Sequence, residues 1–219
     1  MIELLLIRHG ETAWNRERRM QGHIDIPLSE AGVRQAQALG HALAAEQPDA
    51  IFSSDLGRAR ATAQPVADAH RMPVILREAL RERCYGAFEG LLYDEISRRY
   101  PEAFAAWRAR ELHARFPAGE REAETQQEFH DRAVQAVTDI VSAYPAGKLV
   151  VVTHGGVLDC VYREAMGMSI EAERNFGIIN AAINRLQWDG RRFRVLQWSD
   201  ASHLEAAGLD EIDRSHPAA

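Results

Sequence analysis

The sequence contains little cysteine, almost no lysine and no long apolar run. Its two cysteines, Cys84 and Cys160, are too few for the disulfide framework of a small secreted protein, and they lack metal-site spacing. No stretch approaches the roughly twenty apolar residues that a membrane-spanning helix requires. Glu3 and Arg8 interrupt the apolar residues near the N-terminus, so no signal peptide is predicted. We therefore expect a cytoplasmic protein without a membrane partner.

Charge of one sign is not concentrated anywhere in the chain. Of the 219 residues, 46% are hydrophobic and 26% are charged, and the formal net charge is -6. This composition is typical of a globular protein, and the absence of a basic block argues against a nucleic-acid partner. Lys148 is the only lysine, so arginine carries nearly all of the positive charge. The oligomeric state stays open at this stage.

Short apolar runs alternate with helical patterns along the chain. This alternation predicts an α/β fold: a single three-layer domain over residues 1–219, with a mostly parallel central sheet and helices on both faces. The strand candidates are residues 2–7, 49–53, 74–76 and 149–152, with an edge strand near 191–198. The helix candidates run from a cap at Ser29 to about Glu46, onward from Gly57 or Arg58, and from Asp131 to Tyr144.

The strand pattern stops between about residues 91 and 125, here called the 91–125 segment. Apolar and aromatic side chains recur there at helical spacing, and Pro101 suits a first helical turn. The segment is either a plain surface insertion or a lid that shapes a pocket, and its mixture of Arg, Glu and aromatic residues favours the lid. Residues from about 200 to 219 are a candidate flexible tail.

Two of the predicted strands end in histidine. The apolar run of residues 2–7 ends in Arg8-His9-Gly10, and the run LVVV at 149–152 ends in Thr153-His154-Gly155. In open parallel sheets, ligands bind at the carboxyl ends of the strands. The sequence therefore predicts that His9 and His154 lie at the same edge of the sheet.

Two further stretches carry residue types suited to phosphate. In SSDLGRARATA, at residues 53–63, Arg58 and Arg60 lie in the first turn of a predicted helix, where free N–H groups and guanidinium forks both favour anions. In LRERCYGAFEG, at 80–90, Glu82 lies beside glycine-rich turns and would by itself be an ordinary surface carboxylate. Metal binding is the weaker interpretation, because Arg8 adjoins His9 and neither histidine has ligand spacing around it.

Five stretches together resemble the histidine phosphatase superfamily, and specifically its phosphoglycerate-mutase-like branch. They are RHGET with Asn15, QGHIDIPLSEAG, SSDLGRARATA, LRERCYGAFEG and THGG, which follow one another in the order of that family through about residue 156. The later stretch INAAINRL also suits this branch. The resemblance implies phosphoryl transfer through a phosphohistidine, without a metal cofactor.

The resemblance also implies a role for each matching residue. His9 would attack phosphorus through a neutral Nε2 while an acceptor holds its Nδ1–H, and Glu82 would exchange protons with the leaving and attacking oxygens. Arg8, Arg58 and His154 would surround the equatorial oxygens of the phosphoryl group. The remaining candidates for binding substrate or phosphate are Asn15, Gln21, Gly22, Arg60, Tyr85 and Gly155.

The same chemistry serves more than one outcome in this family. The first hypothesis is a phosphomonoesterase acting on a small phosphorylated metabolite. The second is a phosphoglycerate mutase, for which 2,3-bisphosphoglycerate would be a cofactor, and a remote third is an inactive phosphate-ligand binder. Mutases of this type carry a lysine and paired arginines in the lid, whereas this chain has Tyr93 and a single Arg108 there. This difference favours hydrolysis.

Overall fold

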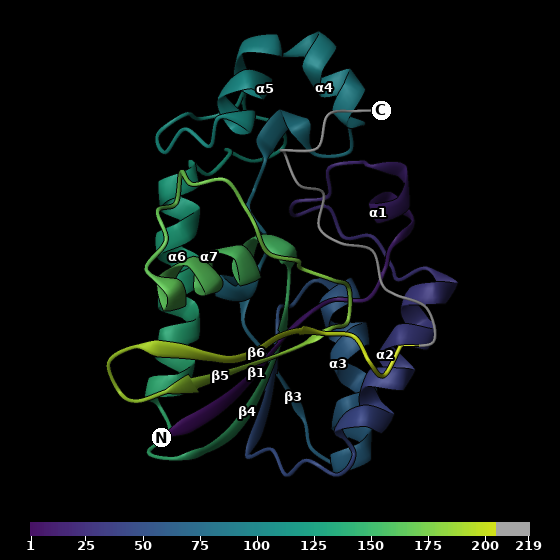
Figure 1. The fold of residues 1–219 in the computed structure, drawn as a ribbon. Coiled ribbons are helices and arrows are strands. Elements are labelled where there is room, and N and C mark those ends of the chain that lie inside the picture. The colour runs from purple at the N-terminus through teal and green to yellow at the C-terminus, as the bar shows by residue number, and fades with distance from the viewer. Residues whose placement is uncertain (205–219) are drawn as a thin grey trace.

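The computed structural model describes residues 1–204, whose centre is a six-stranded sheet in the order β3-β2-β4-β1-β5-β6 (Figure 1). β1 to β4 are mutually parallel, and β5 runs antiparallel to both β1 and β6. The strands are β1 (Ile2–Arg8), β2 (Ala50–Ser53), β3 (Val74–Leu76), β4 (Gly147–Thr153), β5 (Ile183–Trp188) and β6 (Phe193–Asp200). No helix within residues 1–204 is long and apolar enough to cross a membrane.

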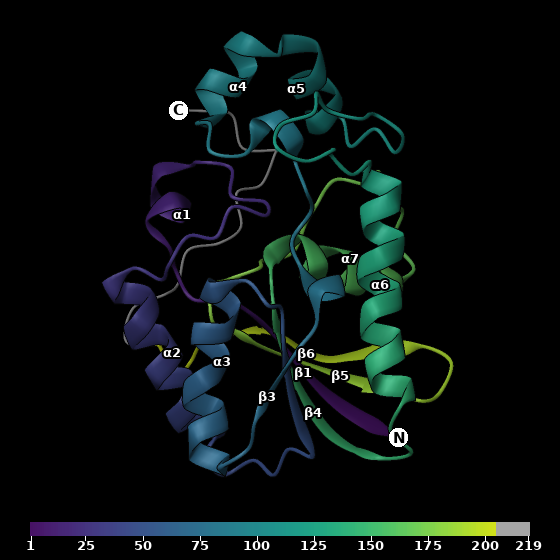
Figure 2. The same ribbon diagram turned by 180° about the vertical axis from the view of Figure 1, so that it is seen from behind.

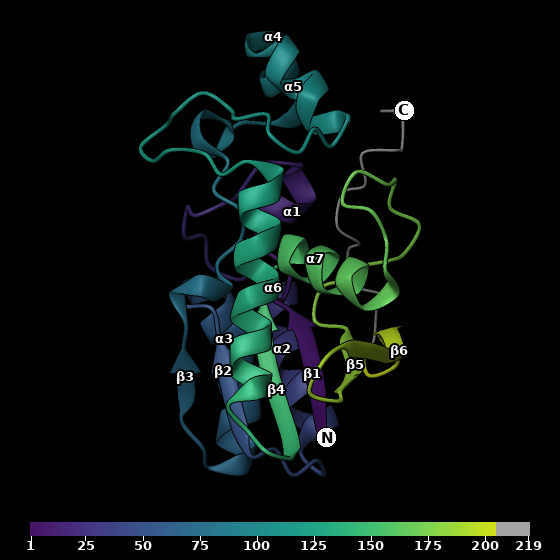
Figure 3. The ribbon, with the colours of Figure 1, turned by 90° about the vertical axis from the view of Figure 1, so that its left-hand side faces the viewer.

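Helices cover both faces of the sheet, and Figure 3, which looks onto one face, shows one pair of helices in front of the strands and the other pair behind them. α2 (Glu30–Leu43) and α3 (Gly57–His70) pack on one face, and α6 (Gln126–Ser142) and α7 (Gly155–Met166) pack on the other. β1 supplies both cores, because side chains alternate along a strand: Leu4 and Leu6 belong to one cluster, and Leu5 and Ile7 to the other. The predicted three-layer α/β architecture is confirmed.

Most predicted elements are present, with different boundaries. Ser29 caps α2, which ends at Leu43 rather than at Glu46. α6 begins at Gln126, five residues before the predicted start, because Thr125 and Glu128 form a capping box. The prediction omitted α7, β5 and the short helix α1 (Ala13–Glu17). The end of the chain from residue 205 lies outside the described residues, and with it most of the candidate tail at 200–219.

The 91–125 segment lies beyond the carboxyl ends of the strands (Figures 1 and 2). It contains two helices, α4 (Tyr93–Arg99) and α5 (Pro101–Arg108), where the sequence pattern suggested continuous helical spacing. The break falls at Tyr100, because a residue that precedes proline is disfavoured in the α conformation. A third apolar cluster, which includes Phe88, Ile96 and Trp107, joins this segment to the loop that carries Glu82.

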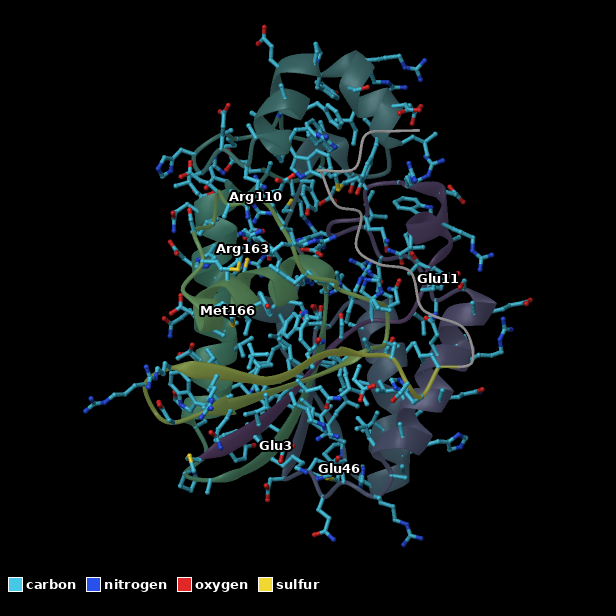
Figure 4. All side chains as sticks on the ribbon, viewed as in Figure 1. Glu3, Glu11, Glu46, Arg110, Arg163 and Met166 are labelled. Carbon is cyan, nitrogen blue, oxygen red and sulfur yellow. The ribbon has the colours of Figure 1, made fainter. Side chains whose placement is uncertain are left out.

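An ion cluster also connects the segment to the body of the protein. Arg110, just beyond α5, donates from Nη2 to Oδ2 of Asp159 at 2.7 Å and from Nε to the Ile170 carbonyl at 2.6 Å. Arg163 donates from Nε to the same Asp159 oxygen at 2.8 Å. Arg110 and Arg163 lie one above the other beside α7 (Figure 4). This cluster ties the 91–125 segment to α7.

Candidate active site

His9 follows β1 directly and is 3% exposed. Its Nδ1 lies 2.7 Å from the carbonyl oxygen of Gly10, which can only accept, so the ring proton is on Nδ1. Burial, followed by the charges of Arg58 and Arg8, holds the pKa of His9 well below its usual value. The ring is therefore neutral near pH 7, with an unprotonated Nε2 that can act as a nucleophile.

Several distant segments hold the loop that carries His9. The His9 amide donates to the Thr153 carbonyl at 2.8 Å, and the His9 carbonyl accepts from Nδ2 of Asn180 at 2.8 Å. The Gly10 amide donates to Oγ1 of Thr62 at 2.9 Å. A Cβ at Gly10 would lie 2.7 Å from the Gly32 carbonyl oxygen, so only glycine allows this approach to α2. The nucleophile is thus fixed from β4, α3, α2 and the segment before β5.

Arg8 and Arg58 are almost fully buried on either side of the histidine loop. Arg8 donates from Nη1 to the Ile178 carbonyl at 2.8 Å. Arg58 donates to the carbonyls of Gly22 and Ile24 at 2.7 and 2.9 Å. These neutral acceptors hold both guanidinium groups in place. The result is a preorganised pair of cations beside a neutral imidazole, which suits a phosphoryl group and its transition-state charge.

Glu82 lies where the loop after β3 meets the start of α7. Its carboxylate oxygens accept from the amides of Arg83 and Gly156, at 2.8 and 2.9 Å. A helix N-terminus favours a negative charge, so the amide of Gly156 both orients and stabilises the carboxylate. The Glu82 carbonyl accepts from Nε2 of His23 at 2.7 Å and from Nη2 of Arg132 at 3.1 Å.

Arg132, on α6, holds the whole of this loop. Besides Glu82, it donates to the carbonyls of Ala79 and Arg81, each at 2.9 Å. Its guanidinium also pairs with Glu124, whose carboxylate accepts the Cys84 amide at 2.9 Å. The position of Glu82 therefore depends on a side chain fifty residues farther along the chain.

His154 is the N-cap residue of α7 and is completely buried. Its ring meets that of His9 edge-on, with the centroids 5.2 Å apart. Its Nε2 lies 2.9 Å from Oγ of Ser54, and burial, followed by the charge of Arg58, holds the pKa of His154 well below its usual value. His154 is therefore a second neutral imidazole beside the first.

A pocket opens at these residues between the sheet and the 91–125 segment. The space that it encloses is about 420 Å³, with open solvent at its mouth included. Among residues 1–204, no group of three or more His, Cys, Asp or Glu is arranged to hold a metal ion. The lining residues are Arg8, His9, Trp14, Asn15, Arg19, Met20, Gln21, Gly22, Arg58, Glu82, Tyr85 and Tyr93.

Comparison with known proteins agrees with this geometry. The family model described as "Histidine phosphatase superfamily (branch 1)" matches residues 4–201. The chain belongs to the histidine phosphatase superfamily. It is 37% identical to "Phosphoglycerate mutase-like protein 4" of Arabidopsis thaliana, over 94% of this chain and 89% of that protein. It is 34% identical to the "Metal-independent phosphoserine phosphatase" of the same plant, over 94% and 85%.

A solved structure has the same fold over almost the whole chain. YhfR of Bacillus stearothermophilus superposes with a TM-score of 0.85 at 36% identity, covering 94% of this chain and 100% of that one. The relatives of this chain therefore include proteins named as phosphatases and proteins named as phosphoglycerate mutase-like.

The structure brings together most of the site residues that the sequence suggested. Arg8, His9, Arg58 and Glu82 line the pocket with Asn15, Gln21, Gly22 and Tyr85, and His154 lies beside His9. Gly155 is buried at the start of α7 and is not among the lining residues. Arg60 is exposed on α3 and does not line the pocket either. Of the three arginines predicted to bind phosphate, Arg8 and Arg58 therefore lie at the pocket and Arg60 lies outside its lining.

Other side chains at the site were missed from the sequence. Trp14, Arg19 and Met20 line the pocket and lie within the stretch around Asn15, so their closeness to a motif residue was the only signal. Ser54, Thr62, Asn180 and Arg132 hold site residues through hydrogen bonds that span large sequence separations. Ser54 and Thr62 lie within SSDLGRARATA and Asn180 lies within INAAINRL, so their places in those stretches were the available signal, whereas no local pattern marks Arg132.

Proposed function

We propose that this protein is a phosphomonoesterase that hydrolyses a small phosphorylated metabolite through a phosphohistidine on His9, without a metal. The observation that carries the proposal is the state of His9, a buried neutral imidazole with Nδ1–H held by Gly10 and with Arg8 and Arg58 beside it. That arrangement leaves Nε2 free to attack phosphorus. The cations supply the charge stabilisation that other phosphatases obtain from a metal.

In the first half of the proposed reaction, Nε2 of His9 attacks phosphorus and the bond to the substrate oxygen breaks. The negative charge of the bound phosphate raises the pKa of the nearby Glu82 carboxyl, so Glu82 is protonated at this stage in the proposed reaction and gives its proton to the leaving oxygen, which departs as an alcohol. Arg8 and Arg58 hold the equatorial oxygens throughout. Asn15 adds a donor, since its Oδ1 accepts from Thr12 at 2.9 Å and its Nδ2 group remains for the pocket.

In the second half, water attacks the phosphohistidine on the face that the alcohol has left. The Glu82 carboxylate removes a proton from this water as the phosphorus–nitrogen bond breaks. Phosphate leaves, His9 returns to its neutral form and Glu82 is again protonated. Acid–base assistance of this kind contributes about 10²–10⁴ in rate.

The 91–125 segment supports hydrolysis rather than phosphoglycerate mutase activity. Arg110 is buried in its pair with Asp159, and Arg115 pairs with Glu128 at 2.5 Å, so neither supplies a cation to the pocket. Tyr93 lines the pocket instead of a lysine. Beyond Arg8 and Arg58, the arginine that lines the pocket among residues 1–204 is Arg19. The relative named as a metal-independent phosphoserine phosphatase supports the same outcome.

Phosphoglycerate mutase activity is the second candidate, and the names of other relatives favour it. For that reaction, the phosphohistidine would have to be shielded from water, and 2,3-bisphosphoglycerate would serve to load His9.

A substrate panel with phosphate release as the readout tests the proposal. We expect turnover of phosphorylated metabolites to survive EDTA and to be lost in His9→Ala. Quenching with labelled substrate should leave phosphate on His9, stable in alkali and released in acid. Activity that EDTA abolishes and magnesium or zinc restores would reject the mechanism. Phosphate binding without any turnover would instead identify an inactive binder.

A further inference from the structure

The surroundings of His154 determine which of its nitrogens carries the ring proton. Its Nε2 lies 2.9 Å from Oγ of Ser54, and both side chains are completely buried. Among the residues that the structure describes, Nδ1 of His154 has no hydrogen-bond partner. Ser54 precedes α3 and His154 precedes α7, so the contact joins the ends of the adjacent strands β2 and β4.

Only one of the two neutral tautomers uses all the hydrogen-bonding groups of this pair. Oγ of Ser54 already accepts from the Leu56 amide at 3.3 Å. If Nε2 of His154 carried the proton and donated to Oγ, the hydroxyl proton of Ser54 would lack an acceptor among residues 1–204. If Nδ1 carries the proton, the hydroxyl of Ser54 donates to Nε2, and both groups are satisfied.

The second tautomer leaves a buried N–H beside the nucleophile. The ring of His154 lies edge-on to that of His9, with centroids 5.2 Å apart, where the phosphoryl group would be attacked. A phosphoryl oxygen only accepts hydrogen bonds, so an Nδ1–H stabilises it, whereas a lone pair on Nδ1 would repel it. Burial and the nearby Arg58 keep His154 neutral. The tautomer of His154 therefore decides whether its Nδ1 stabilises or repels the phosphoryl oxygen.

We propose that Ser54 is a positioning residue that donates to Nε2 of His154 and thereby directs its Nδ1–H to a phosphoryl oxygen. This inference rests on the proposed function of His9 and adds a residue to its machinery. Ser54 itself touches neither substrate nor the reacting atoms in this scheme; it acts through His154.

The chain contains a matched control for Ser54. Ser53 precedes it, is equally buried, and uses its hydroxyl to donate to the Ser54 carbonyl at 2.8 Å. Ser53→Ala and Ser54→Ala each remove one buried hydroxyl from the same strand end. Only the second removes the donor to His154.

The direct test is the ¹⁵N NMR spectrum of the free enzyme, with histidine labelled and the His154 signals assigned by their loss in His154→Gln. We expect Nδ1 to be the protonated nitrogen in the unsubstituted protein and in Ser53→Ala. In Ser54→Ala, we expect protonation to shift wholly or partly to Nε2. Protonation of Nε2 in the unsubstituted protein, or equal populations of both forms, would overturn the proposal. Because this measurement needs no substrate, it holds whether or not the proposed hydrolysis is correct.

Kinetics provide the second readout. Ser54→Ala should lower kcat for an aryl phosphate about tenfold, less than the roughly 10²–10³ seen when a transition-state donor is itself removed. Inhibition by vanadate should weaken by a similar factor, and Ser54→Thr, which keeps the hydroxyl, should recover most of both. Ser53→Ala should stay close to the unsubstituted enzyme. Equal losses in Ser53→Ala and Ser54→Ala would show that packing, and not the tautomer, is responsible. If Ser54→Ala does not fold, the spectrum of the unsubstituted protein still decides.

Discussion

At the scale of single residues, the site depends on charges that are placed before substrate arrives. Arg8 and Arg58 serve two purposes, because the same charges that attract phosphate also disfavour protonation of His9. Burial works in the same direction for His9 and His154. In the proposed reaction, His9 is therefore kept in its neutral, reactive form partly by the same arginines that would bind the phosphoryl group.

This arrangement predicts how stability depends on pH. A histidine with a lowered pKa binds a proton more readily in the unfolded chain, so the free energy of unfolding falls as the pH drops below about 6.5 and is constant above it. His9→Gln should reduce that slope by up to about 1.4 kcal/mol per pH unit. Urea denaturation between pH 5 and 8 measures it. An unchanged slope would show that His9 is not held neutral by the fold.

The proposed role of Glu82 predicts a dependence on the leaving group. Glu82→Gln cannot give a proton to the departing oxygen, so kcat on alkyl phosphates should fall about 10²–10⁴-fold. Aryl phosphates with acidic leaving groups need less assistance and should lose much less. Steady-state rates across a series of leaving groups test this. An equal loss for every substrate would mean that Glu82 orders its loop and does not transfer a proton.

At the scale of secondary-structure elements, the helices on one face of the sheet organise the site. α7 directs the Gly156 amide at Glu82, and α6 supplies Arg132, which fixes the loop of Glu82. α7 also carries Asp159, which pairs with Arg163 of the same helix and with Arg110 from the 91–125 segment. Burial would raise the pKa of Asp159, but the charges and hydrogen bonds of Arg110 and Arg163 hold it below its usual value.

The position of Asp159 between two arginines predicts unequal effects of substitution. Asp159→Asn leaves two buried guanidinium groups facing a neutral side chain and should cost about 3–5 kcal/mol of unfolding free energy. Arg110→Met leaves the pair of Asp159 with Arg163 intact and should cost about 1–3 kcal/mol. Denaturant titration of both variants at neutral pH gives the comparison. A larger loss in Arg110→Met than in Asp159→Asn would contradict this account of the cluster.

At the scale of the whole molecule, the pocket and a network of four partly buried charged side chains lie at opposite ends of the sheet. Glu3 and Glu46 mark the network end in Figure 4, where they pair with Lys148 and Arg185. The pocket lies at the carboxyl ends of β1 and β4, beneath the 91–125 segment. In the parallel part of the sheet, ligands bind at that end because the loops and helix N-termini there are turned toward them.

The composition of the pocket predicts the balance between the two candidate reactions. With Arg110 and Arg115 engaged elsewhere, Arg19 is the one arginine among residues 1–204 that lines the pocket besides Arg8 and Arg58. A single guanidinium would hold a phosphoglycerate carboxylate only weakly during the lifetime of a phosphohistidine. Phosphate release should therefore exceed interconversion of 3- and 2-phosphoglycerate, even with 2,3-bisphosphoglycerate present. Parallel assays of both products decide, with His9→Ala as the blank. Interconversion well above phosphate release would reverse the assignment.

The sequence by itself determined the layers of the fold and the identity of the motif residues. The run of residues 2–7, the cap at Ser29 and the strand before His154 are local patterns, and local patterns determine local structure. The parallel arrangement of β1 and β4 then required His9 and His154 to share one edge. The start of α6 depends on the cap at Thr125, and the break at Tyr100 depends on the proline that follows it. Hydrophobic spacing alone predicts neither boundary.

Only the tertiary structure decided which side chains are available for chemistry. Arg110 and Arg115 belong to the 91–125 segment, and only the structure shows that they pair with Asp159 and Glu128 and do not line the pocket. The contact that orients His154 comes from Ser54, one hundred residues away. A hydrogen bond or ion pair between distant residues depends on where the packed elements place their side chains. For that reason the sequence could name candidate reactive groups of this protein but not the contacts that hold them.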